Sequence, residues 1–142
     1  MQAYEMNKVQ FAYDGEADAF PEIDPGVRPF GSRVLLQIRR AKTKTKGGII
    51  LSGESRDTEM WNTQVAKVRA VGPLAYHNRN TMEPWPEGTW AGVGSHVRAP
   101  KYGGDRWSVL MEGGDEVIFV LFNDLDLLGE ITGDPLAMKA FL

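Results

Sequence analysis

Few side chains in this 142-residue sequence could act as acids, bases or metal ligands, and their spacing does not favour catalysis. His77 and His96 are the only histidines, and neither has the i, i+4 or His-x-Glu spacing of a zinc or general-base site. Asp124 and Asp126 would share one face of a continuing strand, as paired carboxylates do, but a solvated strand edge is the simpler interpretation. The chain has no cysteine, which excludes disulfides, thiolate metal sites and a cysteine nucleophile.

Glycines stand next to carboxylates in "YGGD" and in "EGGDE". Both segments lack the lysine and the strand-to-helix context of a phosphate-binding loop, so hairpin turns are the better interpretation. We therefore predict that the protein is not an enzyme, that it has no catalytic or metal-binding residue, and that it uses no cofactor.

A basic block without any acidic residue lies between Asp24 and Glu54 and consists of Arg28, Arg33, Arg39, Arg40, Lys42, Lys44 and Lys46. Together with Tyr102 and Trp107, this block could neutralise phosphates and stack bases on a small barrel. Alternatively, it is the charged face of a strand that continues into a solvated loop, where lysines discourage edge-to-edge aggregation. The net charge of −3 favours the second interpretation.

An apolar tripeptide, Ile49, Ile50 and Leu51, interrupts the polar segment at the end of this block. The glycines on its two sides, which are Gly47, Gly48 and Gly53, would weaken a strand at this position. The tripeptide lies in residues 41–61, which have no sustained hydrophobic period, and long loops of this kind are usually functional or disordered. The residues alone leave two interpretations open: a three-residue core strand, or an exposed apolar patch that binds a partner.

Strands are predicted where apolar and polar residues alternate. Val34, Leu36 and Ile38 alternate with their neighbours, which predicts a half-buried strand in residues 33–40. The same pattern predicts a second strand in residues 63–71, which ends at Gly72-Pro73. Further strands are predicted in residues 96–100, 106–111, 117–122 and 123–131, and the continuous apolar run of 117–122 must be covered on both faces.

The segments outside these strands are loops and two terminal extensions. Residues 74–94 are rich in turn formers and include Pro84 and Pro86, so they predict a loop or an irregular hairpin. Residues 1–26 have no sustained period and are expected to be an extension. The only predicted helix lies at the C-terminus, with Asp134 as its cap and Pro135 at its first position.

Length and composition limit the class of protein. A chain of 142 residues is most simply one domain, and short strands with glycine-rich turns favour an all-β sandwich or small barrel. The N-terminus lacks the basic start and apolar core of a secretory signal. No apolar run approaches the roughly 18 residues that span a bilayer, so we expect a soluble, cytoplasmic protein.

The order of several motifs resembles the chaperonin-10, or co-chaperonin, family. The motifs are "RPFGSRVLLQIRR", a Thr/Lys segment, "GGIILSG", "VAKVRAVGP", "VGSHVRAPKYGG" and "VLFNDLDLLGEI". In that family an "RPL-x-D-R-V" strand precedes a mobile loop with Gly-Gly-Ile-Val-Leu, and an "A-V-G" strand end, a "V-G-D" turn and an Asp-Ile-Leu-like segment follow. The resemblance covers residues 27–131, and the order of the motifs makes it specific.

The resemblance implies a small, partly open β-barrel with a mobile loop, a roof hairpin or loop, and a short C-terminal helical tail. It divides the chain into an N-terminal extension (1–26), a barrel domain (27–131) and a C-terminal extension (132–142), with the mobile loop at about 41–61 and the roof at about 74–94. It also implies a heptameric ring that caps an ATP-bound host chaperonin and encloses an unfolded client protein.

The resemblance assigns roles to particular residues. Ile49, Ile50 and Leu51 would dock in the apical groove of the chaperonin, and Gly47, Gly48 and Gly53 would be the flexible flanks of the loop. A structural role in the opening strand is implied for Arg28, Pro29, Arg33 and Val34.

The chain also departs from the family pattern. Phe30-Gly31-Ser32 replaces the usual Leu-x-Asp, Ser95 replaces an aspartate, and the two extensions have no counterpart in the common bacterial members. Extended, divergent members resemble bacteriophage-encoded co-chaperonins, which in known cases help to fold a large capsid protein. Two alternatives stay open, namely a β-barrel module that binds nucleic acid and a virion structural or interaction protein.

Overall fold

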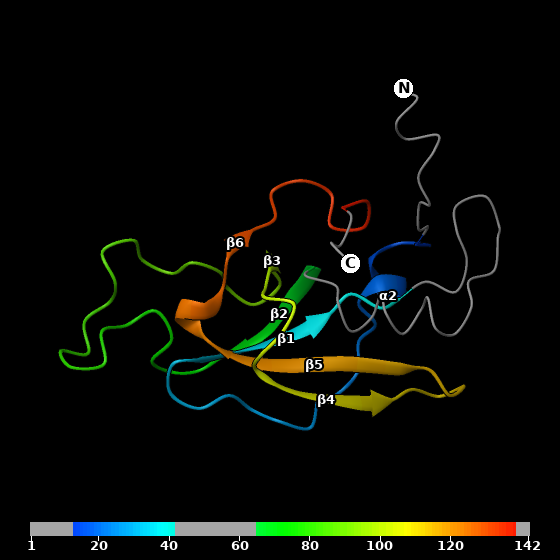
Figure 1. The fold of residues 1–142 in the computed structure, drawn as a ribbon, viewed down its shortest axis with the longest axis horizontal. Coiled ribbons are helices and arrows are strands. Elements are labelled where there is room, and N and C mark those ends of the chain that lie inside the picture. Colours follow the sequence, from blue (N-terminus) through cyan, green and yellow to red (C-terminus); the bar gives the residue numbers. More distant parts are fainter. Residues whose placement is uncertain (1–12, 42–64, 139–142) are drawn as a thin grey trace.

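A computed structural model describes residues 13–41 and 65–138, which form a curved sheet with long connections (Figure 1). The elements of these residues are α2 (Glu16–Ala19), β1 (Arg33–Ile38), β2 (Val65–Val71), β3 (His96–Arg98), β4 (Asp105–Leu110), β5 (Glu116–Asn123), the 3₁₀ helix η1 (Asp124–Asp126) and β6 (Gly129–Glu130). The predicted β class is therefore confirmed, with very little helix in the described part of the chain.

The six strands of the described residues form one antiparallel sheet in the order β4-β5-β1-β2-β3-β6. β1 pairs with β5 on one side, from Arg33↔Asn123 to Gln37↔Phe119. On its other side β1 pairs with β2, from Val34↔Val71 to Ile38↔Ala66, with an irregularity between Leu35 and Leu36. β4 and β6 are the two edges of this sheet.

β1 is buried on both faces, so the prediction of a half-buried strand was wrong. Val34, Leu36 and Ile38 belong to the main core, as their alternation predicted. Leu35 lies in a second apolar cluster on the opposite face, where residues of the N-terminal segment and of β4 and β5 cover it. Gln37 is also fully buried, and its side-chain amide donates to the carbonyl of Pro21 at 2.9 Å. A segment distant in sequence therefore turns a half-polar pattern into a central strand.

The strands predicted in residues 63–71, 96–100, 106–111 and 117–122 are confirmed with small shifts of their ends. The strand predicted in residues 123–131 was wrong, because η1 occupies Asp124–Asp126 and only Gly129–Glu130 pair, as β6. β5 is buried on both faces, as its continuous apolar run required. The "EGGDE" segment forms the β4–β5 hairpin turn, where the Met111 N–H donates to the Asp115 carbonyl at 2.7 Å. In "YGGD", Gly104 has φ +69°, and a Cβ there would lie 2.6 Å from Cγ2 of Val120. This bend therefore requires glycine for both conformation and space. The prediction of a hairpin turn at "YGGD" was wrong, because the segment joins β3 to β4, which lie in different parts of the sheet and do not pair with each other.

The helix predictions need correction. The described C-terminal residues form only a turn, although Asp134 caps it as predicted, since its carboxylate accepts the Leu136 N–H at 2.9 Å. Residues 139–142 lie outside the described part. The one α-helix of the described residues is α2, within the region expected to be an extension without periodic structure. It is one turn long, too short to show a helical period.

Two groups of connections lie at opposite ends of the sheet (Figure 1). Residues 74–94, the predicted loop or irregular hairpin, extend from one end and contain one isolated bridge, His77↔Pro84. α2 and the C-terminal turn lie at the other end. The two ends of the sheet therefore carry different parts of the chain.

Candidate functional site

The predicted docking residues lie outside the described part of the chain: Gly47, Gly48, Ile49, Ile50, Leu51 and Gly53. The structure does describe the two points where the segment 42–64 leaves and rejoins the sheet. The last residue of β1, Ile38, pairs with Ala66 of β2. One residue further, the Arg39 N–H donates to the Val65 carbonyl at 2.9 Å. The two ends of the segment are therefore held side by side by the antiparallel pairing.

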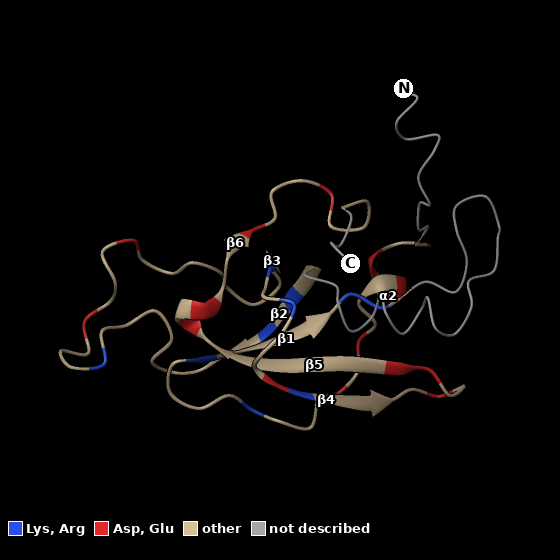
Figure 2. Cartoon of the chain, viewed as in Figure 1, with Lys and Arg blue, Asp and Glu red and all other residues tan. Residues whose placement is uncertain are grey.

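The described members of the basic block do not form one face that could contact phosphates. Arg39 is only 1% exposed, and the Arg40 guanidinium pairs with Asp18 at 2.6 Å and with Asp115 at 2.9 Å. Arg28 lies over the ring of Phe30, with Cζ 5.4 Å from the ring centroid. Acidic and basic positions lie near one another on the ribbon, for example at the start of β4 and around α2 (Figure 2). Of the four described members of the block, Arg39 and Arg40 are therefore engaged by contacts inside the domain, and Lys42, Lys44 and Lys46 lie outside the described residues.

The described tryptophans are packed into the domain and offer no stacking platform for bases. Trp85 and Trp90 pack against Tyr76 and against each other, with 4.7 Å between the two Trp ring centroids. Trp107 stacks on Phe119, and its indole N–H donates to the Pro25 carbonyl at 2.9 Å. Tyr102 is 72% exposed, and Arg28 and Arg33 are exposed as well. The internal contacts of Arg39, Arg40 and Trp107 leave few of the residues named for the nucleic-acid interpretation available to bind phosphates or bases.

Asp124 is a buried structural residue, so the interpretation as a solvated strand edge was wrong for it. Its side chain is 4% exposed, and its two carboxylate oxygens accept the N–H groups of Tyr76 and Leu125, each at 2.8 Å. Tyr76 has the unusual φ of +64° for a residue other than glycine, and the bond to Asp124 helps to hold it there. Asp126 is exposed, as expected.

Tyr76 links this carboxylate to the tryptophans. Its hydroxyl donates to the Ala91 carbonyl at 2.8 Å. Burial raises the pKa of Tyr76 to about 12, and the negative charge of Asp124 acts in the same direction. The group is therefore a neutral hydrogen-bond donor at ordinary pH, and its role is to hold residues 74–94 against the sheet.

The two histidines occupy unrelated places. His77 donates from Nδ1–H to the Ala75 carbonyl at 2.8 Å, within its own loop. His96 lies on β3, where Nε2 is 3.1 Å from Oε1 of Glu16 and the ring is 5.1 Å from the Phe20 ring. No group of three metal-ligating side chains occurs among residues 13–41 and 65–138.

A shallow hollow of about 230 Å³ lies between residues 74–94 and β6. Its lining consists of Glu87, Trp90, Ala91, Val97, Leu127, Leu128, Gly129 and Glu130. Two carboxylates without a nucleophile or a base between them do not form a catalytic group.

The contacts of the N-terminal acids were missed by sequence reasoning. Lys67 pairs with Glu16, and Arg69 pairs with Glu22 at 2.8 Å. A signal was available for part of these contacts, because acids occupy alternate positions in residues 14–24 and the charged residues of 25–53 are all cations. Opposite charges on two neighbouring segments indicate that the segments pack together.

Comparison with known proteins gives the family. Residues 26–131 match the family model described as "Chaperonin 10 Kd subunit". The chain is 35% identical over 102 residues to a mitochondrial 10 kDa heat shock protein of Oryzias latipes, which covers 72% of this chain and 90% of the relative. It is 35% identical over 109 residues to the co-chaperonin GroES of Clostridium botulinum, covering 75% and 98%.

A second bacterial relative agrees with these matches. The co-chaperonin GroES of Tetragenococcus halophilus is 32% identical over 93 residues, covering 66% of this chain and 88% of the relative. None of the helices in the described residues is long and apolar enough to cross a membrane. The family model and these relatives show that the chain belongs to the chaperonin 10 family of non-enzymatic co-chaperonins.

Proposed function

We propose that this co-chaperonin closes the chamber of a nucleotide-bound chaperonin, and that Ile49, Ile50 and Leu51 are the residues that dock. The observation that carries the proposal is the family match over residues 26–131, which includes the tripeptide. Support also comes from the sheet, because β1 and β2 hold the two ends of the segment 42–64 together. A segment anchored in this way can present a short apolar sequence at one defined place.

The size of the contact suits a reversible cap. Burying three aliphatic side chains is worth roughly 1.5 to 3 kcal/mol each, or about 6 kcal/mol together. Ordering the segment on binding would offset about 2 to 5 kcal/mol of this gain. One segment would therefore bind weakly, whereas several copies on one ring would bind tightly and still release. Gly47, Gly48 and Gly53 would supply the backbone freedom that the docking tripeptide needs.

The proposal includes a ring of subunits. Each subunit would be a partly open barrel built from residues 27–131, with residues 74–94 as its roof, and residues 1–26 and 132–142 would be extensions. A heptamer would have a mass of about 110 kDa, which is seven times the 15.8 kDa of one chain. Light scattering tests this directly, and a monomer at working concentration would contradict it.

The extensions and the departures at Phe30-Gly31-Ser32 and Ser95 support a bacteriophage origin for the protein. In that case it would act in the cytoplasm of the bacterial host, on a bacterial chaperonin, and an unfolded phage capsid protein would be a candidate client. Refolding of that capsid protein by the host chaperonin, with this protein or with the host co-chaperonin, tests this part of the proposal.

The docking experiment compares two substitutions of one kind. We expect a purified bacterial chaperonin to retain the wild-type protein only with adenine nucleotide present, and Ile50→Asp to abolish retention without unfolding the sheet. Val93→Asp is the control, because Val93 is an apolar residue that is 66% exposed in the described loop 74–94. Unfolding of Ile50→Asp would instead support the interpretation as a core strand.

A further inference from the structure

The two terminal segments that lie outside the family match meet at the base of the segment 42–64. Residues 13–20 and 134–138 both lie outside residues 26–131. Ala19 and Phe20 are buried in one cluster with Val65 and Ile131, against which Tyr13, Leu136 and Met138 pack. Val65 is the first described residue after that segment. We refer to residues 13–20 and 134–138 as the collar.

The collar holds the backbone of Arg40 on both sides. The Arg40 N–H donates to the Ala19 carbonyl at 2.9 Å. The Arg40 carbonyl accepts the hydroxyl of Tyr13 at 2.6 Å. Arg40 lies two residues beyond the end of β1, so the collar extends the fixed backbone past the sheet. Hydrogen bonds to both polar groups of one peptide residue leave it little freedom.

The Arg40 side chain strengthens the same attachment. Its Nε donates to the Asp18 carbonyl at 2.9 Å, and Nη2 pairs with the Asp18 carboxylate at 2.6 Å. Both side chains are less than one fifth exposed, at 18% and 17%. Charge-assisted bonds of this kind are stronger than neutral ones, and partial burial reduces their screening by salt.

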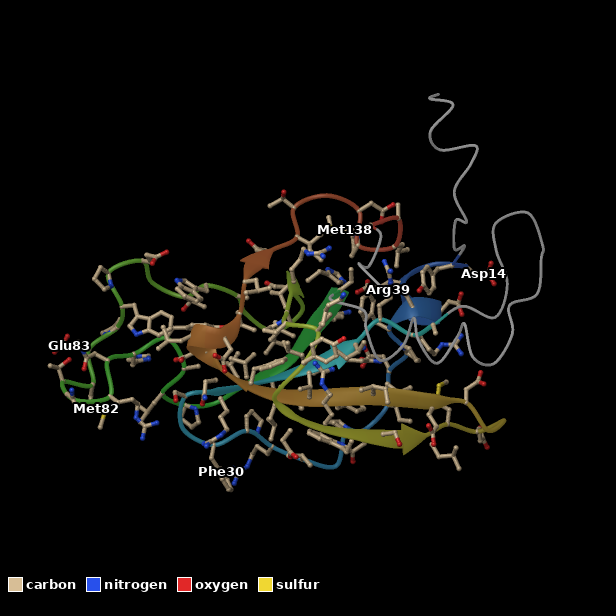
Figure 3. All side chains as sticks on the ribbon, viewed as in Figure 1. Asp14, Phe30, Arg39, Met82, Glu83 and Met138 are labelled. Carbon is tan, nitrogen blue, oxygen red and sulfur yellow. The ribbon has the colours of Figure 1, made fainter. Side chains whose placement is uncertain are left out.

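Arg39 ties the C-terminal part of the collar to the same place. Its Nη1 donates to the Pro135 carbonyl at 3.0 Å and to the Met138 carbonyl. Its Cζ also lies over the Tyr13 ring, 5.4 Å from the centroid. Arg39 and Met138 lie close together in Figure 3, at the end of the sheet where α2 lies. Consecutive arginines therefore bind the two terminal segments.

The collar also contacts β2, the strand that follows the segment 42–64. Lys67 of β2 pairs with Glu16 of α2, and the same carboxylate lies 3.1 Å from Nε2 of His96 on β3. The collar thus contacts the residues before and after the segment 42–64.

We propose that the collar fixes the place where this segment leaves the sheet, and that Arg39 and Arg40 are positioning residues for chaperonin binding. This inference rests on the proposed function. Fixing the backbone of one residue costs conformational entropy equivalent to about a tenfold change in an equilibrium constant. Residues that the collar has already ordered add no such cost when the tripeptide docks, so the contact becomes tighter.

The test measures the affinity of the full-length protein for a purified bacterial chaperonin with adenine nucleotide. We expect Arg40→Met to weaken binding by about tenfold. Arg106→Met is the matched control, because Arg106 also donates from a half-buried position, to the carbonyls of Gly103, Pro100 and Lys101, on β4. The control should change affinity by less than about twofold. Equal affinities of the two variants would overturn the proposal.

A milder pair keeps the test valid if Arg40→Met fails to fold. Tyr13→Phe removes the hydroxyl that donates to the Arg40 carbonyl, and Tyr76→Phe removes the hydroxyl that donates to the Ala91 carbonyl. We expect Tyr13→Phe to bind the chaperonin about threefold more weakly and Tyr76→Phe to bind it as the wild type does. Backbone hydrogen exchange around position 40 should be faster only in Tyr13→Phe. Equal binding and equal exchange in the two variants would overturn the proposal.

The two proposals fail in different ways. If the chaperonin does not retain the wild-type protein, the proposed function is wrong, and the positioning role is wrong with it. If the wild type binds, Ile50→Asp does not, and Arg40→Met binds as tightly as Arg106→Met, then only the positioning role is wrong.

Discussion

The two ends of the sheet hold their connections in contrasting ways. At the end with α2, ion pairs such as Arg40–Asp18 and Lys67–Glu16 join segments distant in sequence. At the other end, Tyr76, Trp85 and Trp90 pack together, and the buried Asp124 carboxylate accepts backbone N–H groups. The first end depends on several charged side chains, whereas the second depends on aromatic packing around one carboxylate.

This difference determines how the stability of each end responds to salt and pH. Ion pairs with a half-exposed partner, such as Lys67–Glu16, are weak individually and respond to salt and pH. A buried carboxylate with two backbone donors is insensitive to salt but costly to remove. We therefore expect the collar to be the adjustable end of the domain and residues 74–94 to be the fixed end.

The largest effect is expected from Phe20→Ala, which tests whether apolar packing at the collar is as important as its charges. Phe20 is 1% exposed, and truncating a buried phenylalanine costs about 3–5 kcal/mol of unfolding free energy. Urea unfolding measures the loss. Phe30→Ala is the control, because Phe30 is 67% exposed and its loss should cost about 0.5 kcal/mol or less. Similar values for the two variants would show that residues 13–26 are not part of the core.

A smaller effect is expected from Asp124→Ala at the opposite end. The substitution leaves the buried N–H of Tyr76 without its acceptor, which should cost about 2–3 kcal/mol of unfolding free energy. The loss should be the same at low and high salt, as measured by chemical denaturation. Asp126→Ala, at an exposed position, should change the stability by less than about 0.5 kcal/mol. A loss that disappears in high salt would contradict the contrast between the two ends.

The smallest effect concerns the pH dependence of the collar. The hydrogen bond from Lys67 and the charges of Lys67 and His96 lower the pKa of Glu16 below its ordinary value of 4.5, against the opposing effect of burial. The stabilisation is therefore complete above pH 4.5 and is lost as the pH falls through the lower folded value. Because Glu16 is 48% exposed, the effect should not exceed about 1 kcal/mol.

Hydrogen exchange of the Ala19 and Phe20 amides at decreasing pH checks this expectation. After correction for intrinsic exchange rates, the wild type should lose protection below pH 4.5, whereas Glu16→Gln should show no such step. A step of the same size in both proteins would assign the acid sensitivity to another group.

The sequence predicted those parts of the fold whose signals are local. The strands at β2 and β5 follow from alternation and from a continuous apolar run, and the hairpin turn of "EGGDE" follows from its glycines. The signal for β1 was correct for Val34, Leu36 and Ile38. Its other face is covered by contacts that include those of Pro21 and Ile23. No local pattern reveals such coverage, because it depends on contacts between segments far apart in sequence.

The residues of the candidate site were less predictable from local sequence patterns than the strands were. The docking tripeptide came from the resemblance to a family, because "GGIIL" alone fits a core strand as well as an exposed patch. Asp124 could not be recognised as buried, because its partner Tyr76 is distant in sequence and has an unusual φ. The collar could have been predicted in part from the acids of residues 14–24, which complement the following basic block.

The position of the collar has a practical consequence for experiments with this protein. Tyr13 and Met138 both pack at the base of the segment 42–64, against the cluster that contains Val65. A label attached at either of these positions would therefore disturb the contacts that hold Arg39 and Arg40. Labels are better placed near Met82 and Glu83, at the opposite end of the sheet (Figure 3).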